Sequence, residues 1–472
     1  MRAAVRVAQV TANSKAGAGT VTVVEVIAFV IGVVLLVVGL AVSIALHELG
    51  HLLPAKKFGV RVGQYMIGFG PTLWSRRRGE TEYGFKAIPL GGYISMAGMY
   101  PPSPALRRRN GAVTGHRTGR AGGGFFATMV QDARTANDET LLSEDDDRVF
   151  YRLPVWKRVV IMLGGPVMNL LLALVLFAIL LSGIGVQTAT TTVQSVSECV
   201  IPSGVTRTTC AASDPIAPAK AAGLQAGDVI VSVDGTGVNT FAEASAIIRK
   251  SPGRTLIVVV ERDGVVHSVN LTPVAVMQPV TDSSGKAVLN PDGSAMTQEV
   301  GFAGIRQEVQ YVRQPIWAGP QAAVENVGAV AGVVFQLPVK VWQTGVSLVT
   351  GQERDPNGPL SVVGAGVLAG EVASADAPVL NRVAGLLSLL ASLNIALFVF
   401  NMIPLLPLDG GHIAVALWDG IKRGWARIFH RPPPKPVDAT KLVPVTFVVV
   451  IALVAMGAVL ILADIFNPVS LF

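Results

Sequence analysis

The chain has 472 residues, of which 51% are hydrophobic and only 15% are charged, and its formal net charge is +7. Soluble globular domains average about 25% charged residues, so this composition excludes an ordinary soluble protein and indicates one that contacts lipid. The basic residues are not interleaved with aromatic ones in a patch, and we therefore expect no nucleic-acid partner.

Four apolar stretches without charge are long enough to cross a bilayer, which takes about 20 residues. They lie at residues 26–46, 159–186, 383–408 and 443–463. We predict a multi-pass α-helical membrane protein with four transmembrane helices, at residues 26–53, 159–186, 383–411 and 443–465, behind an N-terminal segment of residues 1–25. The first apolar stretch exceeds the roughly 7–15 residues of a signal-peptide core and precedes no small-residue cleavage site, so we expect it to be retained.

The segment after the first span has the pattern of a small sheet. Residues 54–100 contain short alternating runs that are separated by breaks at Gly70-Pro71 and Gly91-Gly92. Such runs are typical of hairpin strands, and we predict a membrane-associated β-hairpin region. Residues 101–158 form an insertion whose first part, 101–150, lacks any apolar period, so we expect that part to be flexible and cytoplasmic.

A compact domain is predicted between the second and third spans, at residues 192–273. Its run 221–230, AAGLQAGDVI, and the following Val233-Asp234-Gly235 resemble a PDZ domain. PDZ domains add a peptide as a strand to a sheet edge, which makes peptide C-termini candidate ligands. The alternative is another small β-rich domain with Gly-Asp turns.

Residues 274–382 are predicted to be a linker. Its apolar run at 327–337 is too short to cross a bilayer and is flanked by Glu325 and Lys340, which indicates an amphipathic helix at the outer interface. Two cysteines, Cys199 and Cys210, precede this linker. A disulfide and two separate thiols remain equally open, because sequence spacing does not establish geometry.

The basic residues predict the orientation of the spans. The loop from residue 54 to 158 carries 17 Lys and Arg and the loop at 412–442 carries six, whereas the tail after residue 463 carries none. By the positive-inside rule both loops are cytoplasmic, and the termini and the loop at 187–382 face outside. The basic residues near the N-terminus argue weakly for the opposite orientation.

The motif that predicts chemistry is His47-Glu48-Leu49-Gly50-His51, at the end of the first span. Residues four apart share a helix face, so His47 and His51 can bind one zinc ion while Glu48 stands beside it as a base. Catalytic zinc needs a third protein ligand and an open position for water. Ionisable groups at membrane depth are costly, which favours a functional site over a chance motif.

Asp409 is the favoured third ligand. It follows the third apolar stretch, and the first and third spans both run toward the cytoplasm, so the three groups are expected at one depth. His412, three residues further on, is a rival ligand.

Together these residues resemble the site-2 protease family of intramembrane zinc metalloproteases. The resemblance includes Gly164-Gly165-Pro166-Val167-Met168-Asn169 and the segment from Asn394 to Gly411. It implies one catalytic Zn²⁺ bound by His47, His51 and Asp409, with Glu48 as general base. It also implies that Asn401 holds the substrate backbone or the developing oxyanion, and we assign Asn169 and Asn394 structural roles.

The same resemblance implies the partners and the location. The expected substrates are single-span proteins, such as anti-sigma factors trimmed outside by a first protease, or remnant signal peptides. The expected location is the lipid bilayer of a bacterial inner membrane, with the PDZ domain outside the cytoplasm. A PDZ receptor with a structural metal and a transporter are the rival classes. The intact Glu48 argues against the receptor, and four spans without paired repeats argue against the transporter.

Overall fold

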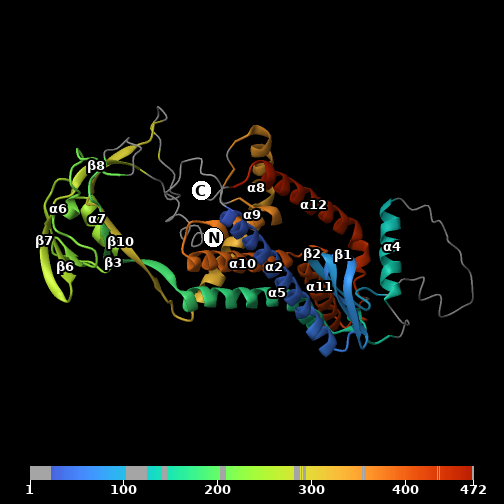
Figure 1. Cartoon of the computed structure of the whole chain (residues 1–472). Coiled ribbons are helices and arrows are strands. Elements are labelled where there is room, and N and C mark those ends of the chain that lie inside the picture. The colour runs from blue at the N-terminus through green and yellow to red at the C-terminus, as the bar shows by residue number, and fades with distance from the viewer. Residues whose placement is uncertain are drawn as a thin grey trace, which may run out of the picture. The chain divides into compact units, whose positions relative to one another are not determined.

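The computed structural model describes residues 23–101, 125–140, 146–201, 209–280, 288, 290, 294–352, 354–355, 358–432, 434 and 436–469. The chain divides into two compact units (Figure 1). Unit 1 comprises residues 1–184 and 314–472, and unit 2 comprises residues 185–313.

Unit 1 is mainly helical. Its helices are α2 (Val23–Lys57), α4 (Phe125–Glu139), α5 (Val155–Ala178, extended by a π-helical segment Ile179–Ile184), α8 (Ala318–Thr350), α9 (Val362–Ser374), α10 (Val379–Asn401), α11 (Asp409–Ile428) and α12 (Val443–Phe466), with short 3₁₀ turns at Phe150–Arg152 and Ala439–Leu442. Within the described residues, five of these helices are long and apolar enough to cross a membrane: α2, α5, α8, α10 and α12. The protein is therefore a membrane protein, as the composition indicates.

Helix α8 differs from the short interfacial helix predicted at 327–337. That prediction was wrong in length, because the helix continues through Pro338 and Lys340 for 33 residues. Lys340 forms an ion pair with Asp355 at 3.0 Å, so its charge does not end the helix. By length and composition alone, α8 is a fifth candidate span beside the four predicted ones.

The two ends of α8 meet the same end of unit 1. A Cβ added at Gly319 would lie 3.0 Å from the backbone of Ala178, at the C-terminal end of α5, and one at Gly345 would lie 3.8 Å from Val459, in the C-terminal third of α12. The N-terminal end of α5 and the segment before α12 both contact helix α11. Asp419 of α11 pairs with Arg158 of α5 and accepts from the backbone of Val437, just before α12.

The third predicted span is wrong at its C-terminal end. Helix α10 ends at Asn401, and a new helix, α11, begins at Asp409. Pro404 and Pro407 lie between the two helices, and proline has no N–H for the helical ladder. Asp409 is therefore the first residue of α11 and does not close the membrane helix.

The predicted hairpin is present as two long strands, β1 (Val62–Arg78) and β2 (Thr81–Met96). The glycine breaks are not its turns, because the chain reverses between Arg78 and Thr81. Each strand instead bends at its glycines. Residues 64–67 of β1 pair with residues 92–95 on one side and with residues 82–85 on the other, so β1 begins between two segments of β2.

The insertion predicted to be flexible contains a packed helix, α4, which corrects that expectation. Asn137 and the backbone of Tyr100 exchange two hydrogen bonds of 3.0 Å. Arg134 pairs with Asp438 at 2.7 Å and donates to Thr440 at 3.1 Å. These long-range bonds hold α4 although its sequence has no apolar period. Residues 102–124 and 141–145 of the insertion lie outside the described residues.

At its C-terminal end, α12 is fixed by a buried ion pair. Asp464 pairs with Arg354 from the segment between α8 and α9, and the exposed fractions of the two side chains are 1% and 2%. Asp464 also accepts hydrogen bonds from the backbone N–H groups of Ser361, at 2.7 Å, and Gly364, at 3.1 Å. The carboxylate therefore caps the N-terminus of α9 as well.

Unit 2 is a β-rich body with one principal helix. Its main sheet has the order β10-β3-β4-β6-β7, with β5 on β4, and a separate hairpin pairs β8 with β9. The elements are β3 (Val186–Val196), α6 (Pro218–Ala221), β4 (Val229–Val233), β5 (Thr236–Gly237), α7 (Phe241–Arg249), β6 (Leu256–Arg262), β7 (Val265–Leu271), β8 (Val274–Pro279), β9 (Thr297–Phe302) and β10 (Ile305–Val312). The unit extends beyond the predicted bounds of 192–273, because β10 pairs with the whole length of β3.

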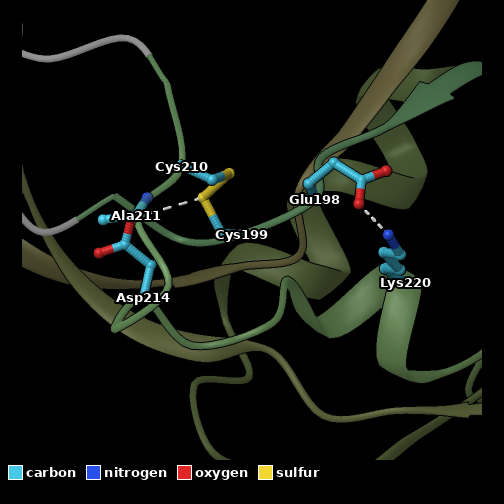
Figure 2. Close-up of a disulfide and its surroundings, with 6 residues drawn as sticks. All are labelled: Glu198, Cys199, Cys210, Ala211, Asp214 and Lys220. Atoms are coloured by element: carbon cyan, nitrogen blue, oxygen red, sulfur yellow. Dashed lines mark hydrogen bonds and ion pairs between the residues drawn. A yellow bond between two sulfur atoms is a disulfide. The ribbon is translucent and has the colours of Figure 1, made fainter.

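A disulfide joins the two cysteines of unit 2, Cys199 and Cys210 (Figure 2). The Cα atoms are 5.9 Å apart. The carboxylate of Asp214 lies beside the bridge and accepts a hydrogen bond from the backbone N–H of Ala211. The disulfide, which the sequence left open, is therefore formed.

Candidate metal centre

Three side chains from two helices converge at the metal-binding group predicted from the sequence. His47 and His51 lie on one face of α2, and Asp409 begins α11. The two Nε2 atoms are 3.2 Å apart, and they lie 3.3 and 3.4 Å from Asp409 Oδ2. Zinc bonds of about 2.0–2.1 Å in a tetrahedron place ligands about 3.3 Å apart. The three donor atoms therefore already have the spacing that zinc requires.

The hydrogen bonding of these groups also fits a metal ion. His51 Nδ1 lies 2.7 Å from the backbone oxygen of Ile161 in α5 and donates to it, which leaves the Nε2 lone pair for a metal. Asp409 Oδ2 is buried without a hydrogen-bond partner among the described residues. A buried carboxylate oxygen needs a partner, and a divalent cation bound by the same group would supply one.

Two glycines of α5 make room for the site. A Cβ at Gly164 would lie 1.9 Å from the backbone oxygen of Gly50, so α2 and α5 touch through their backbones. A Cβ at Gly165 would lie 2.2 Å from His51 Nε2 and 2.8 Å from His47 Cε1. The α5 backbone therefore packs directly against both imidazoles. Small residues permit such close approach between membrane helices.

Glu48 lies next to the ligands and is buried. Strand β2 passes beside it, since a Cβ at Gly92 would lie 2.9 Å from Glu48 Cγ. Tyr65 of β1 donates a hydrogen bond of 2.8 Å to the backbone oxygen of Ala45, which attaches the hairpin to the last turns of α2. The hairpin thus forms one border of the metal centre.

The other polar residues singled out in the sequence take different places. His412 is outside the metal-binding group, and its ring stacks on Tyr100. Asn401 is the half-buried last residue of α10, eight positions before Asp409. Asn394 and Asn169 are fully buried in α10 and α5.

Sequence reasoning assigned no site role to Gly165, to Gly92 or to the backbone oxygen of Ile161. Their roles depend on backbone positions that bring α5 and β2 against α2. The glycine pairs Gly164-Gly165 and Gly91-Gly92 were the signal that could have indicated them.

Two imidazoles one helical turn apart, a carboxylate that completes the triad and an adjacent glutamate fit the zinc site of a metalloendopeptidase. The five long apolar helices make it a membrane enzyme. The sequence profile of peptidase family M50 matches residues 35–431, and the chain belongs to this family, the site-2 proteases.

Curated relatives agree with this assignment. The chain is 34% identical over 452 residues to zinc metalloprotease Rip1 of Mycobacterium tuberculosis strain H37Rv, and the match covers 94% of this chain and 99% of that protein. Rip1 of Mycolicibacterium smegmatis is 34% identical over 459 residues, with the same shares covered. Metalloprotease MmpA of Caulobacter vibrioides is 29% identical over 414 residues, which are 84% of this chain and 88% of that protein.

Proposed function

We propose that the protein hydrolyses peptide bonds of single-span membrane proteins within or at the edge of the bilayer, after another protease has trimmed them. The position of the metal triad carries this proposal. Two of its ligands lie on α2, an apolar helix of 35 residues, and the third begins the helix that follows α10. Ionisable groups on such helices mark function. Anti-sigma factors and remnant signal peptides are the substrate classes that the family suggests.

The roles of the site residues follow from their placement. His47, His51 and Asp409 would hold the zinc ion, and the chemistry it supplies when bound is Lewis acidity toward water and a substrate carbonyl. Glu48 takes the proton of the attacking water and returns it to the leaving amine. Asn401 donates its amide N–H to the substrate backbone or to the developing oxyanion.

The topology we propose has four spans, with α8 along the outer surface of the membrane. The support is that the two ends of α8 meet the C-terminal ends of α5 and α12, while the N-terminal end of α5 and the segment before α12 both contact α11. A helix that crossed the membrane would reach the opposite end.

We place unit 2 outside the cytoplasm of a bacterial inner membrane, because its disulfide suits an oxidising compartment.

The remaining parts receive roles in substrate selection. Strand β2 runs beside Glu48 and can take an unwound substrate segment as an added strand. Unit 2 would act as a PDZ domain that filters substrates by size or binds their trimmed C-termini. The β4–β5 turn at Asp234-Gly235 and the neighbouring helix α7 support this reading.

The test is cleavage of a doubly labelled single-span substrate by the purified full-length enzyme in proteoliposomes. The native enzyme is expected to release both products, and Glu48→Gln is expected to bind zinc but release none. Glu261→Gln, at an exposed carboxylate of unit 2, is the matched control and should cleave normally. The proposal fails if the native enzyme cleaves none of several trimmed substrates. Equal cleavage by Glu48→Gln would remove Glu48 from the mechanism.

A further inference from the structure

Three buried polar side chains on the helices α2, α5 and α10, here called the polar layer, are Ser43, Asn169 and Asn394. Ser43 precedes His47 by four residues on α2, and Asn169 follows Gly165 by four residues on α5, so each shares a face with a residue of the metal centre. Asn394 of α10 joins them, because its Nδ2 donates to Ser43 Oγ at 3.0 Å. The exposed fractions of the three residues are 0%, 1% and 0%.

The hydrogen bonding of this layer is incomplete. Ser43 donates to the backbone oxygen of Gly39, and Asn394 Nδ2 also donates to that of Leu390, both at 2.8 Å. Asn394 Oδ1 and both amide atoms of Asn169 have no partner among the described residues. Buried polar atoms are hydrogen-bonded in the great majority of native proteins. These three atoms can therefore exchange hydrogen bonds with a bound ligand.

The free atoms match a peptide backbone. Asn169 offers an NH₂ donor and a C=O acceptor on one planar amide, which can pair with the C=O and N–H of an extended chain. A transmembrane substrate satisfies its backbone internally, and these groups lose their partners when the helix is unwound for cleavage. In lipid an unpaired backbone group is costly, so a binding site for it must supply hydrogen bonds.

We propose that Asn169 and Asn394 bind the main chain of the unwound substrate, one turn further along the spans than the metal. This inference rests on the proposed intramembrane proteolysis. It replaces the structural role that the sequence suggested for both asparagines. Because the contacts are to backbone atoms, they hold substrates of different sequence in one register against the metal centre.

A matched pair of variants tests the energetic role. Asn169→Ala is expected to lower kcat/KM by about tenfold, as expected for losing one or two hydrogen bonds, while zinc content stays at that of the native enzyme. Asn381→Ala is the control. Asn381 of α10 is also buried with an amide oxygen that has no partner among the described residues, but it lies in the first turn, 13 residues before Asn394. Native kcat/KM in Asn169→Ala and Asn394→Ala would overturn the proposal.

Cross-linking tests the contact itself. In the Glu48→Gln background, Asn169→Cys is expected to form a disulfide with single cysteines at one or two substrate positions flanking the cleavage site, and Asn381→Cys with none of them. A lowered rate without any cross-link at position 169 would assign the free amide to bound water and overturn the proposal. If the native enzyme cleaves no substrate, the proposed function fails, whereas the cross-link still reports whether a helix reaches Asn169.

Discussion

Gly165 lies directly behind His51, so close that a single added carbon would come within 2.2 Å of the metal-binding Nε2. The α5 backbone therefore fixes where the imidazole can stand, and the backbone oxygen of Ile161 fixes its tautomer from the same helix. The packing of α5 against α2 therefore positions His51 in the candidate metal centre.

Gly165→Ala is expected to weaken zinc binding by about 10- to 100-fold, the range found when groups that orient a ligand are changed. The added methyl group must displace His51 or separate α5 from α2. Zinc per protein after equilibration with a competing chelator measures this. Gly457→Ala, on α12 where an added Cβ meets no atom within 4 Å, should keep native affinity. Equal zinc affinities for the two variants would contradict the claim that the α5 backbone positions His51.

Asp409→Asn and His412→Ala separate the two candidate third ligands. The carboxylate oxygen of Asp409 lies 3.3 Å from His47 Nε2, whereas His412 stacks on Tyr100 outside the triad. We expect Asp409→Asn to lose most of its zinc and all cleavage, and His412→Ala to retain stoichiometric zinc. Metal analysis of the purified proteins decides between them, and zinc loss confined to His412→Ala would reverse the assignment.

Asp464→Asn is expected to destabilise unit 1 by about 3–5 kcal/mol, because it leaves Arg354 buried without its counter-charge. The midpoint of thermal unfolding in detergent measures the effect. Lys340→Ala breaks a more exposed pair with Asp355 and should cost about 0–1 kcal/mol. Similar midpoints for the two variants would show that the Arg354–Asp464 pair does not hold α12.

The stability of unit 2 should depend on pH through Asp228. Burial alone would raise the pKa of this carboxyl, but hydrogen bonds from Arg262 and the backbone of Gln225 outweigh it and hold the pKa below its ordinary value. A depressed folded-state pKa gives stability that is present above the ordinary pKa of Asp, about 3.9, and is lost as the pH falls through the folded pKa.

Hydrogen exchange of unit 2 in the full-length protein checks this dependence. Arg262→Met should lower the protection of β4 and β6 at neutral pH. The difference from the native protein should shrink as Asp228 protonates in both proteins. Arg254→Met, which removes an exposed pair with Asp234, should leave protection unchanged. A difference that grows with acidity would contradict a lowered pKa for Asp228 in the folded protein.

The sequence predicted the enzyme class and the metal-binding group better than the architecture around them. His47 and His51 could be predicted as candidate ligands because their spacing equals one helical turn. Asp409 could be predicted because it follows an apolar span. The helix break before Asp409 was missed, because hydropathy continues unchanged through residues 402–408. Helix α4 was missed because its stability comes from partners far away in the sequence, such as Asp438 and Tyr100. Hydropathy and local sequence patterns do not reveal contacts between residues that are far apart in the sequence.

The candidate metal ligands come from helices α2 and α11, so a bound ion would join the first apolar helix to a helix in the last third of the chain. An ion that binds the folded protein alone stabilises it by mass action, in proportion to the logarithm of its free concentration over Kd. Zinc bound at this group would therefore raise the free energy of unfolding of unit 1.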